Sequence, residues 1–189
     1  MPHIYGERVT LRDFRQEDIS GMRSWCNDPS ITRYLGPRYA TVIPWEQTEA
    51  ELNRYLNGDA GGYNLVVAER ESGKYLGQVA LFMVDHLSRK AELAIVLAPD
   101  SLEKGYGYEA LKLLLGFGFG QVNLNRIWLT VNSGNHRAIH VYEKAGIVRE
   151  GVFRQDRFIN GRYADTVVMS IVREDYKRER GQDGARSGN

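Results

Sequence analysis

The order of elements in this chain is decided by residues 95–110, which read IVLAPDSLEKGYGYEA. An apolar run stopped by Pro99 predicts a buried strand, and a short loop with Gly105 and Gly107 then leads into a helix. Such a loop turns several main-chain N–H groups towards one point at the positive end of a helix dipole, and glycine lets a bulky anion come close. We therefore expect a phosphate or pyrophosphate at residues 103–108, although the two glycines taken alone could equally serve to ease a tight turn.

Two common phosphate-binding signatures do not account for this loop. The chain has no G-x-x-x-x-G-K-[ST] sequence, so a P-loop is absent. The pattern G-x-G-x-x-[GA] is met, with Ala110 in its third position, but no acidic residue lies between Gln121 and Tyr142. A dinucleotide-binding fold would place its ribose-binding carboxylate there, so we discount that fold as well.

A second informative segment covers residues 135–146, which read NHRAIHVYEKAG. Asn135 suits a helix N-cap and Gly146 a helix end. Seven residues separate Asn135 from Tyr142, which places both on one helix face and lets them reach the same ligand. The alternative is a capping asparagine with a half-buried tyrosine and no ligand.

The remaining periodicity predicts one mixed α/β domain over residues 1–176, closed by a hairpin with Asn160-Gly161 at its turn. From residue 173 the chain becomes polar, and we expect a frayed tail, with residues 177–189 outside the domain. The expected strands are 9–12, 63–69, 75–84, 89–98, 126–131, 147–159 and 162–172, and the expected helices are 13–27, 44–57, 105–120 and 135–145, with a short helical turn in 31–35 and a loop around 36–38.

Composition restricts the class of protein. Among 189 residues, 25 Lys and Arg nearly balance 24 Asp and Glu, which gives no general attraction to nucleic acid or anionic membranes. A single cysteine, Cys26, excludes a disulfide framework and a multi-cysteine metal site, and no run approaches the length that spans a bilayer. We expect a cytoplasmic protein with no metal, nucleic-acid or membrane partner, and leave homo-oligomerisation open.

In this order, the two segments resemble the GNAT superfamily of N-acetyltransferases, particularly bacterial spermidine N-acetyltransferases and ribosomal-protein N-terminal acetyltransferases. The resemblance covers roughly residues 7–176 and is strongest in 90–110, 125–151 and 158–171. It implies a single GNAT-like α/β (α+β) domain: a mixed, mostly antiparallel sheet flanked by helices, strands splayed at a CoA cleft, and a C-terminal β-hairpin. It also implies direct transfer of an acetyl group from acetyl-CoA to a primary amine, either of a small molecule such as a polyamine or of a protein N-terminus.

The resemblance assigns roles to individual residues. Tyr142 takes the general-acid position, and Glu92 that of a base or water-positioning carboxylate, unless Glu92 merely pairs with Arg89 or Lys90 at the surface. The CoA-binding residues it implies are the main chain of Ile95, Val96 and Leu97, the loop of Leu102, Glu103, Lys104, Gly105, Tyr106, Gly107 and Tyr108, and the helix from Asn135 to Lys144.

The loop departs from the family pattern at two positions. Leu102 stands where the family has Gln or Arg, and Glu103 stands where many relatives have glycine. Main-chain donors do much of the work of such a loop, and Leu102 retains them. A carboxylate repels pyrophosphate, so we expect the Glu103 side chain to point to solvent.

Acetyl transfer to an amine requires both a proton acceptor and a proton donor. An amine with a pKa near 10.4 costs about 4.6 kcal/mol to deprotonate at pH 7, so a base must accept its proton. A tyrosine with an ordinary pKa of about 10 can protonate a leaving thiolate of pKa about 8.5 at a cost of roughly 2 kcal/mol. His136 and His140 are interpreted as helix-surface residues.

The acceptor is less well defined by the sequence. Spermidine acetyltransferases carry acidic residues after their counterpart of Arg33-Tyr34, whereas this chain has Leu35-Gly36-Pro37-Arg38. The nearby acids are Glu46, Glu49, Glu51 and Asp85. A peptide N-terminus or another small primary amine fits equally well, and a non-catalytic acyl-CoA sensor or interaction module on the same fold is the alternative function.

Overall fold

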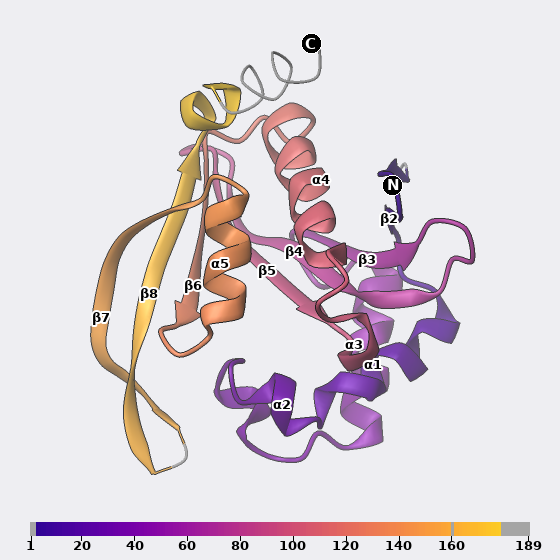
Figure 1. Cartoon of the computed structure of the whole chain (residues 1–189). Coiled ribbons are helices and arrows are strands. Elements are labelled where there is room, and N and C mark those ends of the chain that lie inside the picture. Colours follow the sequence, from indigo (N-terminus) through magenta and orange to yellow (C-terminus); the bar gives the residue numbers. More distant parts are fainter. Residues whose placement is uncertain (1–2, 160, 179–189) are drawn as a thin grey trace.

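Eight strands form one sheet in the order β1-β2-β3-β4-β5-β6-β8-β7 (Figure 1). The computed structural model describes residues 3–159 and 161–178. All neighbouring strands are antiparallel except β5 and β6, which are parallel. The strands are β1 (Ile4–Tyr5), β2 (Val9–Arg12), β3 (Tyr63–Glu69), β4 (Tyr75–Asp85), β5 (Lys90–Leu97), β6 (Arg126–Asn132), β7 (Val148–Ile159) and β8 (Arg162–Val172).

Helices cover both faces of this sheet. They are the α-helices α1 (Ile19–Cys26), α2 (Pro29–Thr32), α3 (Trp45–Asn57), α4 (Tyr106–Gly120) and α5 (His136–Lys144), and the short 3-10 helices η1 (Gln16–Asp18), η2 (Pro37–Ala40) and η3 (Pro99–Ser101). Every predicted strand is confirmed to within one residue at either end, and so are the predicted helices that became α3, α4 and α5.

Alternation along β3 explains the two layers. Leu65 and Val67 point into the main core, which includes the leucines of α4 and the buried face of α5. Val66 and Ala68 point to the other face, where Met22 of α1 and Leu52 of α3 cover them. A strand buried on both sides therefore separates α4 and α5 from α1 and α3.

The predicted helix over residues 13–27 is wrong in its first half, where the structure has a 3-10 turn at Gln16–Asp18 and α1 begins only at Ile19. The cause is a buried ion pair: Arg12 Nη1 and Nη2 each donate to the Asp18 carboxylate at 2.8 Å, and Arg15 N donates to it at 2.7 Å. These bonds hold the chain between Arg12 and Asp18 in a tight loop instead of a helix.

The polar C-terminal segment is also more ordered than predicted. Residues 173–178 are helical, and the ring of Tyr176 stacks on Phe119 of α4 with centroids 4.7 Å apart. The expectation of a frayed tail from residue 173 is therefore wrong for these six residues; the rest of the predicted tail lies outside the described residues.

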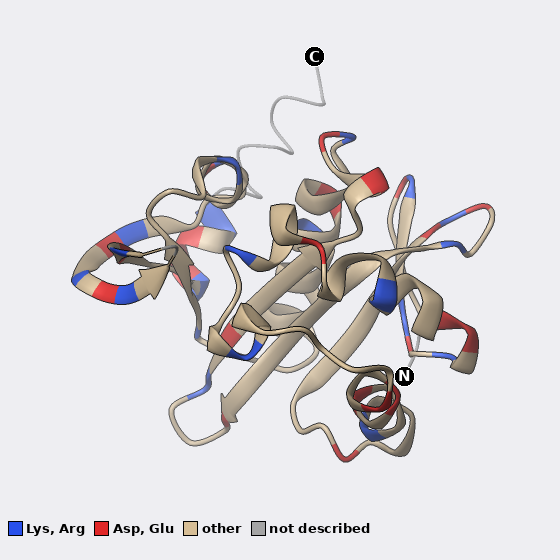
Figure 2. Ribbon diagram, turned by 90° about the horizontal axis from the view of Figure 1, so that it is seen from below, with Lys and Arg blue, Asp and Glu red and all other residues tan. Residues whose placement is uncertain are grey.

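The closing hairpin is confirmed by its register, in which Ile159 of β7 pairs with Arg162 of β8. Gly161 has φ of +78°, as a tight two-residue turn requires, whereas Asn160 lies outside the described residues. Positive and negative residues alternate along this hairpin, which lies at the left of Figure 2. In the described part of the chain, no helix has the length and apolar character needed to cross a membrane.

Candidate active site

The sheet splits between β5 and β6 just after Glu92. The parallel register between these strands covers only Lys90–Arg126, Ala91–Ile127 and Glu92–Trp128. On its other side β5 stays paired with β4 as far as Leu97. Residues 93–97 therefore have a free main-chain edge, which confirms the predicted splay.

The direction of each main-chain group on this edge follows from strand alternation. The Ala98 N–H donates to Leu76 O at 2.8 Å, towards β4. Main-chain groups alternate in direction along a strand, so the N–H and C=O groups of Val96, two residues earlier, also point to β4. Those of Ile95 and Leu97 point to the open edge. Of the three residues expected to offer main-chain bonds, Val96 is thus the exception, because its polar groups are used within the sheet.

A cleft of about 470 Å³ lies at this split. It is enclosed by β5, the glycine loop before α4, α5 and the segment after α2. The structure brings together all of the predicted site residues in its walls except Lys104 and Tyr106. The predicted residues that line it are Glu92, Ile95, Val96, Leu97, Leu102, Glu103, Gly105, Gly107, Tyr108, Asn135, Tyr142 and Lys144.

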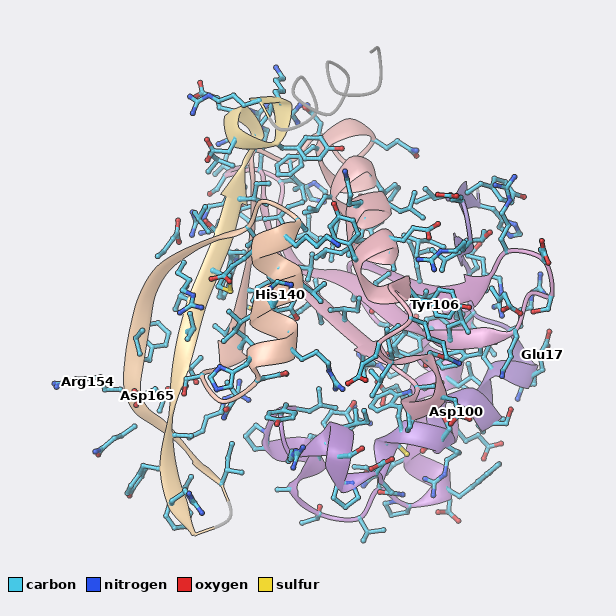
Figure 3. The ribbon with its side chains drawn as sticks, in the orientation of Figure 1. Glu17, Asp100, Tyr106, His140, Arg154 and Asp165 are labelled. Atoms are coloured by element: carbon cyan, nitrogen blue, oxygen red, sulfur yellow. The ribbon has the colours of Figure 1, made fainter. Side chains whose placement is uncertain are left out.

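Lys104 and Tyr106 instead contact Arg8, outside the cleft. Arg8 Nη1 donates to Lys104 O at 2.9 Å, and the Arg8 guanidinium lies 5.3 Å from the ring centre of Tyr106, which is labelled in Figure 3. Glu109 adds to this junction by accepting the N–H groups of Arg8 and Val9 at 2.7 and 3.1 Å. These contacts fix the start of α4 to the beginning of β2.

The start of α4 has the properties that a diphosphate requires. Gly105 is its N-cap with φ of +81°, no side chain caps the helix, and the first main-chain bond runs from Glu109 N to Gly105 O. The N–H groups of Tyr106, Gly107 and Tyr108 therefore have no acceptor within the described structure. A Cβ on Gly107 would lie 3.3 Å from Leu97 Cδ1, so a larger side chain at this position would crowd the wall of the cleft.

The charged side chains around this loop also suit a diphosphate. The Lys144 ammonium lies 4.6 Å from the ring centre of Tyr108, on the cleft side of α5. The Glu103 side chain is 80% exposed and pairs with Arg137 at 3.8 Å, which confirms that this carboxylate points to solvent. A positive charge thus lies over the Tyr108 ring in the first turn of α4, and the one carboxylate of the loop is exposed and paired with Arg137.

Tyr142 reaches the cleft from α5. The N-cap predicted at Asn135 is confirmed, since its Oδ1 accepts the Ala138 N–H at 3.2 Å, and Gly146 follows the helix with φ of +81°. Tyr142 is 7% exposed, and burial raises the pKa of its phenol to about 12. The phenol is therefore protonated at neutral pH.

The raised pKa changes the cost of proton donation. Protonating a thiolate of pKa 8.5 from this phenol costs about 5 kcal/mol, against the roughly 2 kcal/mol expected for an ordinary tyrosine. Burial also raises the proton affinity of a sulfur in the same cleft, which offsets part of this difference.

Glu92 approaches from the opposite face of the sheet. Alternation places its side chain on the same face as Val96, which packs against the cluster of Trp25 and Ile31. Burial raises the pKa of the Glu92 carboxyl, and the nearby positive charge of Arg157 partly counters this. Within the described residues, no ion pair joins Glu92 to Arg89 or Lys90, so the surface-pair alternative finds no support.

Several cleft residues were missed by the sequence analysis. Arg157 is one of them: it belongs to β7, yet its Nη1 donates to Leu35 O at 3.2 Å, across 122 positions of sequence. No local pattern in the sequence signals such a contact. His140, labelled in Figure 3, is exposed as predicted but also lines the cleft. The other missed residues include Ile31, Tyr34, Phe82, Thr130 and Arg137.

The acids proposed for a polyamine pocket lie elsewhere. Glu51 forms an ion pair with Arg38 and accepts the Tyr55 hydroxyl, and Asp85 accepts the Ser88 N–H at 2.8 Å. Neither these two nor Glu46 and Glu49 line the cleft. Over residues 3–159 and 161–178, no group of three or more His, Cys, Asp or Glu is placed to hold a metal ion.

One cleft thus contains the split of the sheet, a glycine loop with free N–H groups and the buried phenol of Tyr142. Residues 8–148 match the family described as "Acetyltransferase (GNAT) domain", and the chain belongs to this family. It is an acetyltransferase with acetyl-CoA as its donor.

Relatives of known name are similar over most of the chain. Spermidine N(1)-acetyltransferase of Escherichia coli K12 is 29% identical over 172 residues, 90% of this chain and 89% of that protein. The putative ribosomal N-acetyltransferase YdaF of Bacillus subtilis is 28% identical over 141 residues, 74% of this chain and 72% of that protein. A crystal structure of spermidine N-acetyltransferase from Vibrio cholerae with CoA and spermine has a TM-score of 0.80 at 29% identity, over 90% of this chain and 99% of that one.

Proposed function

We propose that this enzyme acetylates the primary amine of a small molecule, with Tyr142 as general acid and Glu92 as the group that receives the proton of the amine. The observation that carries the proposal is that one cleft contains the free edge of β5, the glycine loop and both of these side chains. Two relatives described as spermidine acetyltransferases, one of them solved with spermine, support a small-molecule acceptor.

Binding of the donor is assigned to main-chain groups. The free N–H groups at the start of α4 hold the diphosphate, and Ile95 and Leu97 bond the pantetheine amides along the open edge of β5. When bound, acetyl-CoA supplies an electrophilic thioester carbon and a thiolate leaving group. The N–H of Leu93 also faces the open edge and can stabilise the negative charge that develops on the carbonyl oxygen.

Proton transfer is divided between the two faces of the sheet. Glu92 accepts a proton from the ammonium group of the acceptor, directly or through water, and frees the nitrogen lone pair. As the new N–C bond forms and the C–S bond breaks, Tyr142 donates its proton to the sulfur, and the second amine proton returns the phenol to its neutral form. The products are an amide and free CoA thiol, with no covalent enzyme intermediate.

The decisive experiment measures free CoA thiol with acetyl-CoA and a panel of small primary amines. We expect saturable, acceptor-dependent thiol release for at least one amine. Saturable binding of acetyl-CoA without release for any amine in the panel would overturn the proposal and favour the sensor function.

Gly107→Val tests the donor site. The new side chain projects towards Leu97 and into the cleft, so we expect the dissociation constant for acetyl-CoA to rise at least about tenfold. Isothermal titration calorimetry measures it. Gly120→Val, at the other end of α4 with open space around its Cβ position, is the matched control and keeps normal affinity. Equal affinity in both variants would remove this loop from the binding site.

The acidic limb of the rate profile tests Glu92. Its pKa is raised above the usual glutamate value, and Glu92 must be ionised to accept a proton, so kcat/KM falls as pH falls through this raised pKa. Because Arg157 lowers that pKa, Arg157→Gln moves the acidic limb to higher pH. In Glu92→Gln the limb disappears. An acidic limb that keeps its position in both variants would assign the base to another group.

A further inference from the structure

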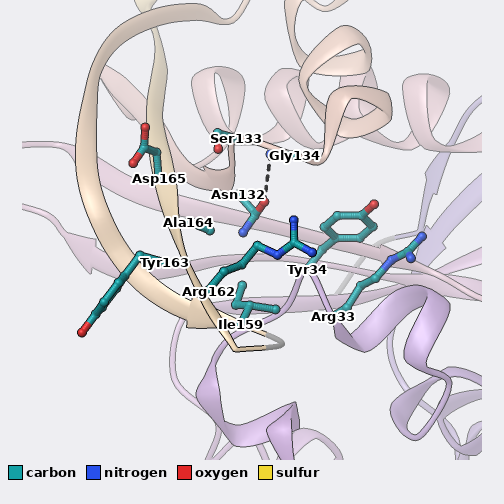
Figure 4. Close-up of a pocket in the computed structure, with 10 residues that line it drawn as sticks. All are labelled: Arg33, Tyr34, Asn132, Ser133, Gly134, Ile159, Arg162, Tyr163, Ala164 and Asp165. Atoms are coloured by element: carbon teal, nitrogen blue, oxygen red, sulfur yellow. Dashed lines mark hydrogen bonds between the residues drawn. The ribbon is translucent and has the colours of Figure 1, made fainter.

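A second cavity of about 450 Å³ adjoins the cleft, and we call it the arginine pocket (Figure 4). It lies between the end of α2, the turn from β6 to α5 and the closing hairpin. Its polar lining residues include Arg33, Tyr34, Asn132, Ser133, Arg162 and Asp165.

The arginine pocket and the cleft share a wall. Tyr34 lines both cavities. Along β6, Thr130 and Val131 line the cleft, and the next residue, Asn132, lines the arginine pocket. One residue of a strand advances about 3.3 Å, so a small molecule in the cleft can extend into this pocket.

The arginine pocket is rich in hydrogen-bond donors. Arg33 and Arg162 both line it, and within the described residues neither forms an ion pair. Asn132 Oδ1 accepts the Gly134 N–H at 2.8 Å, so the amide NH₂ of Asn132 is left to donate. Figure 4 shows Arg162 extending towards the ring of Tyr34.

The one carboxylate of the pocket is used locally. Asp165 Oδ1 accepts the Gln155 N–H at 2.8 Å within the hairpin, and in Figure 4 the Asp165 side chain points away from Arg162. The Arg33 guanidinium lies 4.8 Å from the ring centre of Tyr34 and extends away from Arg162 in Figure 4. The pocket therefore presents the guanidinium of Arg162, the amide of Asn132 and the hydroxyl of Ser133, with no carboxylate among them. Such a donor set matches a carboxylate or a phosphate.

Among the residues described, the cleft lacks the unpaired carboxylates that would be needed to bind a polycation. Its two acidic residues are Glu92, which faces Arg157, and Glu103, which pairs with Arg137 at the donor end. A polyamine would leave its remaining ammonium groups next to guanidinium groups, which is unfavourable.

We propose that the acceptor is a small primary amine that also carries an anionic group, carboxylate or phosphate, and that Arg162 binds this group in the arginine pocket. This inference rests on the proposed function. It assigns Arg162 as a residue that determines specificity and places the reactive amine in the cleft and the anion beyond Tyr34.

The test compares matched acceptors by thiol release: a dipeptide and its C-terminal amide, an amino-sugar phosphate and the unphosphorylated sugar, and spermidine. We expect kcat/KM for one anionic acceptor to exceed that of its uncharged partner at least about tenfold. The pair that shows the difference identifies the group as a carboxylate or a phosphate. In Arg162→Gln that ratio falls at least about tenfold, mainly through KM.

Arg154→Gln is the matched control, because Arg154 is an exposed arginine of the same hairpin that lines neither cavity and points outward in Figure 3. It keeps the wild-type ratio. Preference for spermidine, or a ratio that Arg162→Gln leaves unchanged, overturns the inference and leaves the proposed function intact. Absence of thiol release with every amine overturns the proposed function instead.

Discussion

Tyr142→Phe lowers kcat by about 10²–10⁴-fold while the dissociation constant for acetyl-CoA stays within twofold of wild type. Tyr142 is the buried ionisable side chain of α5 that lines the cleft, and its pKa of about 12 keeps the phenol protonated. Without it, the thiolate must leave unprotonated or take a proton from water. Stopped-flow thiol release and calorimetric titration of acetyl-CoA measure the two quantities separately.

The pH profile gives an independent check of Tyr142. A general acid must be protonated, so activity falls as pH rises through its pKa, and with a pKa of about 12 this alkaline limb lies well above the position of an ordinary tyrosine. Tyr5→Phe, at an exposed tyrosine remote from the cleft, is the matched control and leaves kcat unchanged. Full turnover by a well-folded Tyr142→Phe variant would exclude the phenol from the reaction.

Asp18→Asn lowers the free energy of unfolding by about 3–5 kcal/mol, the largest stability effect that we expect in this chain. Arg12 and Asp18 are 4% and 2% exposed, and the substitution leaves the guanidinium of Arg12 buried without its counter-charge. The same guanidinium also donates to Asp13 O and Gly73 O, so it joins β2, η1 and the turn after β3. Urea unfolding followed by circular dichroism measures the change.

Glu17→Gln is the control for this ion pair. Glu17 pairs with Arg15, two residues earlier in the chain. Both side chains are at least half exposed, so loss of this ion pair costs less than about 1 kcal/mol. A change of similar size in Asp18→Asn would mean that the buried pair contributes no more than a surface one.

Local sequence patterns predicted the sheet and the core of the site because both depend on short-range periodicity. The strand before Pro99, the glycine loop and the Asn135–Tyr142 spacing are each contained in one segment. The first helix was misplaced because Arg12 and Asp18 form their bond through the fold and compete with helical hydrogen bonds. The helix over residues 173–178 was missed because it depends on Tyr176 meeting Phe119.

The acceptor side could not be predicted for a related reason. Tyr34, Arg157 and Arg162 belong to segments far apart in the sequence, and only the closing hairpin brings them to the same two cavities. In the local sequence, Arg157 and Arg162 look like ordinary charged surface residues and Tyr34 like a single aromatic residue. The direction of the main-chain groups of β5 also became clear only from the register with β4.

The separation of the two binding regions along the chain bears on how such enzymes diversify. In the proposed function, donor contacts come from β5, the glycine loop and α5, whereas the acceptor side is supplied by the segment after α2 and by the hairpin. Substitutions in these two segments can therefore change the acceptor specificity of an ancestral enzyme without lowering its affinity for the coenzyme. For the engineer, the hairpin and residues 33–36 form a pair of segments to exchange together, because Arg157 joins them through the Leu35 carbonyl.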